Sequence, residues 1–453
     1  MMDIKKITEE KGHYLVGFHD IDPWSSNSNT FLCLKVESME EIPNANTYAE
    51  IVLVDLESGK VSPLDRTICW NFPQGGRQAW IKKGSTDRII FNVLYENRFV
   101  AKIIDTEGSL VRFCDKPTYC ISPCQEFSYG LNYERMYRLG GYGYAGVMDK
   151  TAGIHTPEED GIWKTDLATG NSELILSLKE IAHTKGNGPI LFETDHYVTH
   201  ILPSPDGSKI CFLHRYWLPD GGIQTRLVIC DNDGTGSEVW DEGFLSHFDW
   251  IDNESIMIWG KPITKAQALR SSSFLQKAPI IPALLQLVKP VVRKLLGKKI
   301  IAQGFYKIVT TREKFSNEKF SEELPIQDGH PSFCPKNRSL LLTDTYPNED
   351  WVRQLMVFDC KENKLHVFGE LKQSDKKPSA VNYESVLPYI DKDVMKKFSM
   401  DNFVYSRSGI HCDFHPRWKS DCGYFAIDSN HEGYRSVYIV KLPEELNQCM
   451  LTH

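Results

Sequence analysis

Two short segments place imidazole and carboxylate side chains two residues apart. His247 and Asp249 form a pair, and His411, Asp413 and His415 form a set of three. Residues two apart in an extended strand point to the same side, so each segment would present its polar groups along one edge. Nitrogen and oxygen donors of this kind suit a transition metal or a substrate cation. We therefore take His247, His411, Asp413 and His415 as candidate metal ligands.

A second cluster has the chemistry to bind an acidic sugar. His214 and Arg215 are followed directly by Tyr216 and Trp217. An arginine can bind a carboxylate with two parallel hydrogen bonds, and an aromatic ring can stack on a sugar ring. Tyr144, in the glycine-rich segment 140–146, could flank the same site. The alternative is an ordinary charged strand end.

A repeated unit carries these residues. The segments 199–213, 329–343 and 414–428 each read as a short strand, a tight turn and a strongly apolar strand. The first has Pro205-Asp206-Gly207 at its turn, which supplies the residues that tight turns favour. Most units continue into a third strand that ends in Asp before another turn, as at 51–55, 101–105, 162–166, 227–231 and 355–359.

The spacing of these units predicts the fold. The residues that should open each inner strand, which we call anchors, are His19, Gln78, Gln125, His200, His247, His330 and His415. Two of their intervals are 47 residues, and three others equal one such unit plus 28, 36 or 38 residues. Insertions fall at 138–160, 261–304 and 370–409.

Four short strands in about 45 residues are typical of a β-propeller blade. We predict an all-β fold in which residues 1–453 form a single seven-bladed propeller of four-stranded blades. Residues 2–10 should pair with the last blade. A pair of β-sandwiches would also contain many short strands, but the regular register favours the propeller.

The first strand of every blade lines the central channel of a propeller, so the anchors should form a ring. Five of the seven are histidines, although the chain has only 14 histidines in 453 residues. They either cap loops and bond to neighbouring blades, or gather as a metal or catalytic cluster, and both readings stay open. Candidate substrate contacts are His330, Gln78, Gln125, Asp249, Trp250 and Tyr144.

The sequence resembles the oligogalacturonate lyase-like propellers. The resemblance spans nearly the whole chain outside the insertions, and it rests on the motifs at 200–207, 246–250, 329–333, 343–347, 415–418 and 428–433. It implies a seven-bladed enzyme that cleaves uronate disaccharides by β-elimination, with a manganese-type metal held by histidines and a glutamine. His247 and His415 fall on metal-ligand positions, and Asp413 stands where the family has a further histidine.

The same resemblance places His200 at the position of the catalytic base. The family's glutamine and arginine have no counterpart at the expected positions; Lys164 is the nearest basic residue, and Arg215 could substitute from another strand. If the chemistry holds, the metal and an arginine acidify the proton next to the uronate carboxylate, and His200 removes it. His200, Arg215 and His214 are therefore the candidate catalytic residues.

The insertion at 261–304 carries an unusual charge. From Lys261 to Arg312 there are eleven Lys or Arg and no Asp or Glu, so this stretch is +11 and the rest of the chain is −19. Leucines and valines within 283–300 fall on one face of a helical wheel, opposite Lys289 and Arg293. Such a basic amphipathic helix could contact anionic lipid or a protein partner. Alternatively, it packs against the acidic flank of its own propeller.

The net charge, the N-terminal residues and the absence of two catalytic motifs exclude several classes of protein. A net charge of −8 and a pI near 6.0 argue against nucleic-acid binding. The N-terminal residues resemble no export signal and no run is long enough to span a bilayer, so we expect a cytoplasmic protein, peripheral to the inner membrane if the basic helix binds lipid. The twelve cysteines are expected to be buried, reduced thiols. Neither a nucleophile elbow nor a phosphate-binding loop motif is present.

Two function classes follow. The first is a metal-assisted lyase that acts on an acidic oligosaccharide, with manganese as the expected metal. The second is a non-catalytic propeller that binds a glycan intermediate or a protein at the inner membrane surface, in the metabolism of a surface polysaccharide. The departures from the lyase motifs favour the second class, and the aligned histidines favour the first.

Overall fold

The computed structural model describes residues 2–188, 190–218, 221–261, 304–379 and 383–446. The predicted basic helix at 283–300 lies outside the described residues, as does nearly all of the insertion 261–304. The chain divides into two compact units. Unit 1 comprises Met1–Lys150, Trp163–Glu173 and Gly329–His453, and unit 2 comprises Thr151–Ile162 and Leu174–Asp328.

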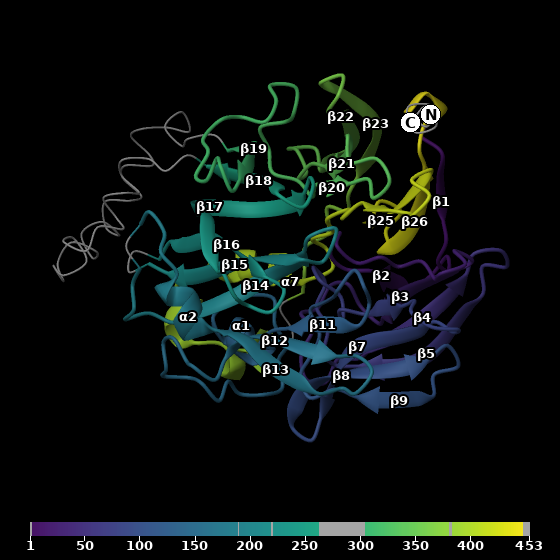
Figure 1. Ribbon diagram of the computed structural model, residues 1–453. Coiled ribbons are helices and arrows are strands. Elements are labelled where there is room, and N and C mark those ends of the chain that lie inside the picture. Colours follow the sequence, from purple (N-terminus) through teal and green to yellow (C-terminus); the bar gives the residue numbers. More distant parts are fainter. Residues whose placement is uncertain (1, 189, 219–220, 262–303, 380–382, 447–453) are drawn as a thin grey trace. The chain divides into compact units, whose positions relative to one another are not determined.

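The described residues form antiparallel sheets in which consecutive strands are neighbours (Figure 1). Such four-stranded meanders are the blades of a β-propeller. Three of the sheets are β2(His13–Leu15)-β3(Thr30–Val36)-β4(Ala49–Asp55)-β5(Val61–Thr67), β6(Ala79–Ile81)-β7(Arg88–Tyr95)-β8(Arg98–Asp105)-β9(Leu110–Phe113) and β10(Cys120–Ile121)-β11(Phe127–Gly130)-β12(Gly161–Asp166)-β13(Ser172–Ser177). Two more are β20(Ser332–Phe333)-β21(Leu340–Asp344)-β22(Val352–Asp359)-β23(Lys364–Lys372) and β24(Arg417–Trp418)-β25(Tyr424–Ser429)-β26(Ser436–Lys441)-β1(Ile4–Lys6).

The described chain has six sheets, so the prediction of seven blades was wrong. Unit 2 contains a single six-stranded sheet, β14(His196–Pro203)-β15(Lys209–Trp217)-β16(Ile223–Asp231)-β17(Glu238–Trp250)-β18(Ser255–Lys261)-β19(Phe305–Thr310). Its β17 is 13 residues long and pairs with β16 through its first half and with β18 through its second half. Because no turn separates the two halves, the blades expected at His200 and His247 share one sheet.

The aspartates that end the third strands explain why these strands could be predicted from the sequence. Asp55, Asp105 and Asp359 each close a strand, and the Oδ1 atom of each accepts hydrogen bonds from backbone N–H groups of the following turn. The side chain thereby fixes the turn that leads to the fourth strand. The predicted third strands correspond to β4, β8, β12, β16 and β22.

Two anchors were assigned to the wrong element. Gln125 lies in the turn between β10 and β11, where its φ is 58° and its N–H donates to the Ser122 carbonyl at 2.8 Å. His19 lies between β2 and β3. The inner strand β10 has only two residues, so the regular spacing of the anchors does not locate it.

The predicted pairing of the N-terminus with the last blade is confirmed. β1 pairs with β26 in antiparallel register, with Ile4 opposite Val440 and Lys6 opposite Tyr438. Beside this closure the buried Asp428 carboxylate accepts hydrogen bonds from the Val16 N–H at 3.2 Å and from two arginines. Residues of the first and last sheets also share one apolar core.

Short helices lie outside the sheets. α1(Tyr133–Arg138) follows β11, and Asn132 caps its N-terminus. The predicted insertion 370–409 contains two 3-10 turns, η2(Tyr383–Ser385) and η3(Leu387–Tyr389), and two helices, α6(Lys392–Met395) and α7(Met400–Arg407). In unit 2, α2(Leu178–His183) begins with a capping box formed by Ser177 and Glu180. None of the helices in the described part of the chain has the length and apolar character needed to cross a membrane.

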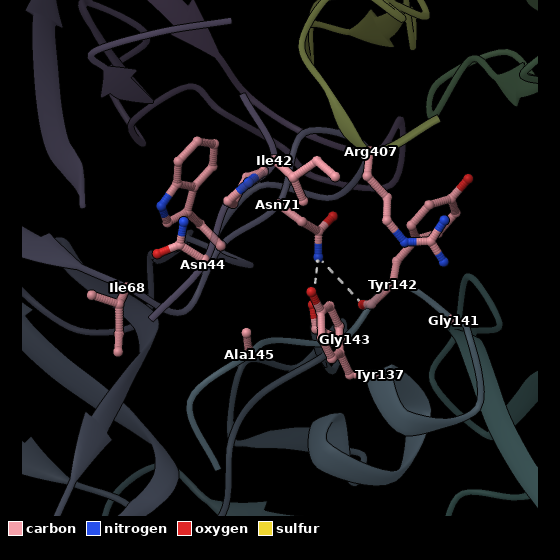
Figure 2. A pocket seen from close by; sticks show the side chains of 12 residues that line it. Ile42, Asn44, Ile68, Asn71, Tyr137, Gly141, Tyr142, Gly143, Ala145 and Arg407 are labelled. Carbon is pink, nitrogen blue, oxygen red and sulfur yellow. Dashed lines mark hydrogen bonds between the residues drawn. The ribbon is translucent and has the colours of Figure 1, made fainter. Parts of the chain in front are cut away.

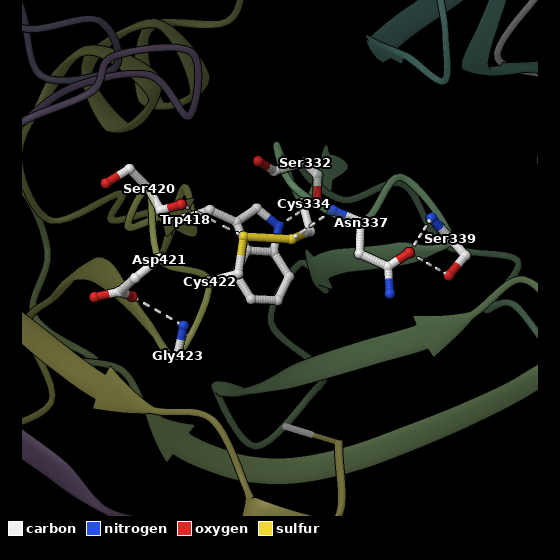
Figure 3. Close-up of a disulfide and its surroundings, with 9 residues drawn as sticks. All are labelled: Ser332, Cys334, Asn337, Ser339, Trp418, Ser420, Asp421, Cys422 and Gly423. Carbon is white, nitrogen blue, oxygen red and sulfur yellow. Dashed lines mark hydrogen bonds between the residues drawn. A yellow bond between two sulfur atoms is a disulfide. The ribbon is translucent and has the colours of Figure 1, made fainter. Parts of the chain in front are cut away.

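One pair of cysteines departs from the prediction of reduced thiols. Cys334 and Cys422, 88 residues apart, form a disulfide between the turn after β20 and the turn after β24 (Figure 3). The two cysteines are far apart in the sequence, and the bridge joins equivalent turns of two successive blades. Other cysteines, including Cys33, Cys69 and Cys114, are buried thiols as expected.

Candidate metal centre

Three polar side chains gather in the interior of unit 1. One ligand atom from each of His330, Asp413 and His415 lies within 4.8 Å of the other two. His330 and His415 are 1% exposed and Asp413 is 7% exposed. Buried polar groups are costly unless they have partners, so the surroundings of each group decide what this cluster can do.

Asp344, at the end of β21, orients His330. Its Oδ1 lies 2.8 Å from His330 Nδ1 and also accepts the His330 backbone N–H at 2.8 Å. Its Oδ2 accepts the Phe414 N–H at 3.2 Å, between Asp413 and His415. A carboxylate that holds Nδ1 of a histidine directs Nε2 toward a metal. Here Nε2 lies 3.9 Å from Asp413 Oδ2.

The Asp344 side chain is ionised in this setting. Burial would raise its pKa, but the positive potential of His330, their hydrogen bond and the charge of Arg353 outweigh burial, and the pKa lies below its ordinary value. The carboxylate is therefore able to hold the imidazole at neutral pH.

Asp413 is also kept ionised. Its Oδ1 lies 2.7 Å from Arg353 Nη2 and 3.2 Å from His411 Nε2. Burial opposes its charge, but His411 and Arg353 together hold the pKa of Asp413 well below its usual range. The predicted ligand His411 thus contacts Asp413, a residue of the cluster, and does not itself belong to the three-residue group.

His415 is held as a neutral imidazole. Burial, and next the nearby His330, keep the pKa of His415 well below its ordinary value. Its backbone φ is 43°, in the left-handed region that non-glycine residues rarely adopt. Its Nδ1 is buried without a hydrogen-bond partner among the described residues. A neutral imidazole with an unbonded nitrogen is a suitable metal ligand.

The donor set fits a divalent transition metal. Two imidazoles and one carboxylate form a mixed nitrogen and oxygen site, which manganese, iron and zinc accept. Asp344 supplies the outer contact that such sites use to orient a histidine. His19 lies near the cluster as well, with its ring centroid 5.9 Å from that of His330 and 6.2 Å from that of His415.

The remaining predicted metal ligand, His247, and the predicted base, His200, belong to unit 2. Their contacts within that unit are as follows. His247 lies at a bulge of β17, and its Nδ1 is 3.1 Å from Asp328 Oδ1. His200 lies at a bulge of β14 with a φ of 58°, and its Nδ1 is 2.9 Å from Thr199 Oγ1. Their roles stay predictions.

His214 and Arg215 do not present one surface. As consecutive residues of β15 they point to opposite faces of the sheet. His214 is buried between His196, whose Nδ1 is 2.8 Å from His214 Nε2, and Arg226, whose Nη1 is 3.3 Å from His214 Nδ1. Burial, and next the charges of His196 and Arg226, place the pKa of His214 well below its ordinary value.

The predicted substrate contacts differ in their surroundings. Gln78 is buried and donates from Nε2 to the Val16 carbonyl at 2.6 Å, whereas Gln125 accepts the Lys82 N–H. Tyr144 is buried and stacks on Tyr133, with ring centroids 4.4 Å apart.

In unit 2, Asp249 Oδ1 accepts the Trp250 N–H at 2.8 Å, and Trp250 lies in an apolar core. His330 was expected among the substrate contacts, and the structure instead groups it with Asp413 and His415.

Two residues that support the cluster were missed in the sequence. Asp344 lies in the Thr343-Asp-Thr345 segment of the motif at 343–347. It follows His330 by 14 residues, and this spacing indicates a contact only once β20 and β21 are known to pair. Arg353 is the second residue of β22 and lies in a strand with no other unusual feature. No spacing rule connects either residue to a histidine.

Comparison with known proteins bears on the fold. No family model matches the chain, and no curated protein is similar to it in sequence. Among solved structures, it is similar to an oligogalacturonate lyase from Vibrio parahaemolyticus, with 12% identity, 98% of this chain and 94% of that chain covered, and a TM-score of 0.56.

Two other similar structures have lower scores. An oligogalacturonate lyase in complex with manganese has 11% identity, the same coverage of 98% and 94%, and a TM-score of 0.38. The tricorn protease has 11% identity, covers 96% of this chain and 34% of its own, and has a TM-score of 0.43. The similarity to the Vibrio protein shows that the chain has a β-propeller fold.

Proposed function

We propose that this propeller is a metal-dependent lyase that cleaves an acidic oligosaccharide by β-elimination. The observation that carries the proposal is the buried group of His330, Asp413 and His415, with Asp344 holding His330. The fold similarity to an oligogalacturonate lyase supports the choice of reaction. Manganese is the metal that we propose, since a mixed histidine and carboxylate site accepts it.

The protonation state of each of the three residues determines what it can contribute to the proposed metal site. Asp413 supplies the negative charge of the site, and the neutral His415 and the oriented His330 supply nitrogen donors. A divalent ion held by His330, Asp413 and His415 would supply positive charge that makes the C–H beside a substrate carboxylate more acidic. Arg353 and His411 hold the pKa of Asp413 well below its usual range.

In the proposed reaction a base removes the proton next to the uronate carboxylate, and the bond to the 4-linked sugar breaks. A carbon–carbon double bond forms and no water is consumed. The sequence assigns the base to His200, the contact with the substrate carboxylate to Arg215, a further catalytic role to His214 and metal binding to His247. These four assignments are part of the proposal and rest on the sequence.

A second function has one observation in its favour. Asp413 already pairs with Arg353 at 2.7 Å and His411 at 3.2 Å, so the network can be stable without a metal. The alternative is therefore a non-catalytic propeller that binds an acidic glycan or a protein partner. Contact with a membrane through 283–300, a cytoplasmic location and a role in surface polysaccharide metabolism remain predictions.

Elemental analysis of the purified protein separates the two functions. We expect near-stoichiometric manganese, iron or zinc in the natural protein, and its loss in a His330→Ala, His415→Ala double variant. His366→Ala, in β23 and outside the cluster, is the control and should keep the metal. Activity on oligogalacturonate should appear as ultraviolet absorbance of the unsaturated product.

Protein that stays metal-free after incubation with these ions would contradict the lyase proposal and leave the binding propeller. Metal binding without any unsaturated product would retain the site and reject this substrate.

A further inference from the structure

The loop between α2 and β14 in unit 2, here called the α2–β14 loop, is held on the sheet by buried charged side chains. Arg226 of β16 donates to the Ile181 carbonyl at 3.3 Å and to the Thr184 carbonyl. The Glu242 carboxylate of β17 accepts the N–H groups of residues 187–188. Two strands therefore hold the end of α2 and the first half of the loop. The described residues of the loop are 184–188 and 190–195.

Two histidines connect the same arginine to the second half of the loop. His214 Nδ1 lies 3.3 Å from Arg226 Nη1, and His214 Nε2 lies 2.8 Å from His196 Nδ1. His196 Nε2 lies 2.7 Å from the Leu191 carbonyl oxygen. Both histidines are 0% exposed. The four groups form one buried chain of hydrogen bonds that runs from β16 to the α2–β14 loop.

Only one arrangement of protons satisfies every contact in this chain. A guanidinium group only donates, and a carbonyl oxygen only accepts. Arg226 therefore donates to His214 Nδ1, which leaves His214 Nε2 as the donor to His196 Nδ1. His196 Nε2 then donates to the Leu191 carbonyl. Both imidazoles are neutral and carry their single proton on Nε2.

An additional proton breaks the chain wherever it is placed. On His214 it would put an N–H group opposite the Arg226 guanidinium. On His196 it would put two N–H groups opposite each other, unless His214 moved its proton to Nδ1, where it would again face Arg226. The low pKa of His214, caused first by burial and next by the charges of His196 and Arg226, agrees with this geometry. The histidines therefore take up a proton when these contacts open.

Other ionisable groups beside the chain respond differently to acid. The Tyr216 ring stacks on His196 with centroids 4.7 Å apart, and burial raises the pKa of Tyr216, so it keeps its proton. Burial also raises the pKa of Glu242 and of the adjacent Asp241, which pairs with Lys307 at 2.5 Å. A carboxyl group with a raised pKa stabilises the closed state as the pH falls. These acids therefore oppose an acid-induced opening.

Two other histidines contact the loop or its flanks, and protonation does not break their contacts. His155 Nδ1 lies 2.9 Å from Asp195 Oδ1, and a positive charge on His155 strengthens this pair. His183 Nδ1 donates to the Lys179 carbonyl at 2.7 Å, and its ring lies 4.9 Å from that of Phe192. An additional proton on His183 would go to Nε2 and leave the bond to the carbonyl in place.

We propose that His196 and His214 form an acid-sensitive latch, which holds the α2–β14 loop on the sheet at neutral pH and releases it on acidification. Release would uncover the apolar cluster of Leu191, Tyr216 and Leu218. None of the proposed metal ligands takes part, so this inference goes beyond the proposed lyase activity and does not depend on it.

The sign and size of the pH dependence follow from the neutral chain. Each histidine that binds a proton only in the open loop raises the opening constant by up to about tenfold per pH unit below the ordinary pKa near 6.5. Protonation of Glu242 in the closed state can offset about one such factor. We therefore expect the opening constant of the loop to rise at least about fivefold per pH unit between pH 6 and pH 5.

Hydrogen exchange of the full chain between pH 7 and pH 5, read by mass spectrometry and corrected for the intrinsic exchange rate, measures this opening in peptides that contain Leu191. The loop after α1 in unit 1 is the internal reference. There Asn71 Nδ2 donates to the Tyr142 and Gly143 carbonyls at 3.3 and 3.2 Å, as Figure 2 shows. An amide does not titrate in this range, so the protection of the reference loop should stay constant.

His196→Gln removes one of the two proton-binding groups of the latch. We expect its α2–β14 loop to be more open at pH 7 and its opening constant to rise by a smaller factor per pH unit. His183→Gln is the matched control and should keep the full pH dependence. Nitrogen NMR of the natural protein labelled at histidine provides a test that needs no variant: at pH 7, His196 and His214 should both carry their proton on Nε2.

Four results would overturn the proposal. They are a loop opening that does not change between pH 7 and pH 5, release that occurs only together with the reference loop, an unchanged pH dependence in His196→Gln, or a proton on Nδ1 of either histidine at pH 7.

Discussion

The proposed metal centre depends on single residues around it, and Asp344 contacts two parts of it. It fixes Nδ1 of His330 and also holds the backbone between Asp413 and His415. Removal of such an outer carboxylate typically weakens metal binding by 10- to 100-fold. We therefore expect Asp344→Asn to reduce manganese affinity within this range, measured by titration. Asp359→Asn, at the end of the next strand, is the control, and an equal loss there would contradict the role of Asp344.

A second residue-scale effect concerns pH. The pKa of His214 is well below its ordinary value in the folded protein, so the unfolded chain binds a proton more readily. Stability from this residue is therefore complete above the unfolded pKa near 6.5 and is lost as the pH falls below it. One such group contributes a slope of up to about 1.4 kcal/mol per pH unit.

Urea denaturation between pH 7 and pH 5 measures this slope. We expect the His214→Gln variant to be less stable at pH 7, because it loses the contacts to His196 and Arg226. It should also show a smaller loss of stability on acidification. An unchanged slope would mean that other groups, such as His415, account for the whole pH dependence.

Sequence reasoning at the residue scale recovered part of the centre. The spacing of Asp413 and His415 predicted that they would lie close together, and one ligand atom of each lies within 4.8 Å of the other. Asp344 was missed because the pairing of β20 with β21 brings it to His330, and Arg353 was missed because only the contact between two blades brings it to Asp413.

At the scale of elements, a buried group of charged side chains lies beside the closure formed by β1 and the last blade. Asp428 in β25 accepts hydrogen bonds from Val16, Arg417 and Arg435, all of which are buried. A neutral amide cannot balance two buried guanidinium groups, and loss of one partner in such a network costs about 3–5 kcal/mol. We expect Asp428→Asn to lower the free energy of unfolding by about that amount, measured in urea. Asp421→Asn, an exposed turn residue, should change it by less than about 0.5 kcal/mol.

Some strands were predicted from the sequence pattern, whereas the junction inside β17 and the shortest inner strands were not. Strands that end in Asp were found because the side chain fixes the turn that follows. The junction inside β17 was not found, because the strand runs from Glu238 to Trp250 and no turn residues mark the end of its first half. Short inner strands such as β10 and β24, each of two residues, leave too little alternation to locate an anchor.

At the scale of the whole chain, the repeat length was enough to predict a propeller, and it was not enough to count the blades. Each blade buries its apolar faces against its neighbours, so every unit needs the same strand pattern. Insertions of different length interrupt that pattern and leave the number of units open to error. The sequence also carried no sign of the Cys334–Cys422 bridge, since its two turns approach only when successive blades stack.

The Cys334–Cys422 disulfide joins distant parts of the sequence close to two of the proposed metal ligands. Cys334 follows His330 by four residues and Cys422 follows His415 by seven. The disulfide closes a loop of 88 residues, and cross-links of this kind stabilise a fold by about 2–4 kcal/mol. We expect a reducing agent or Cys422→Ser to lower the urea midpoint accordingly and to weaken metal binding, because the bridge ties together the ends of β20 and β24, the two short strands that His330 and His415 directly precede. Cys124→Ser, an exposed thiol outside the bridge, should change neither quantity, and equal metal affinity of the reduced and oxidised protein would separate the bridge from the metal centre.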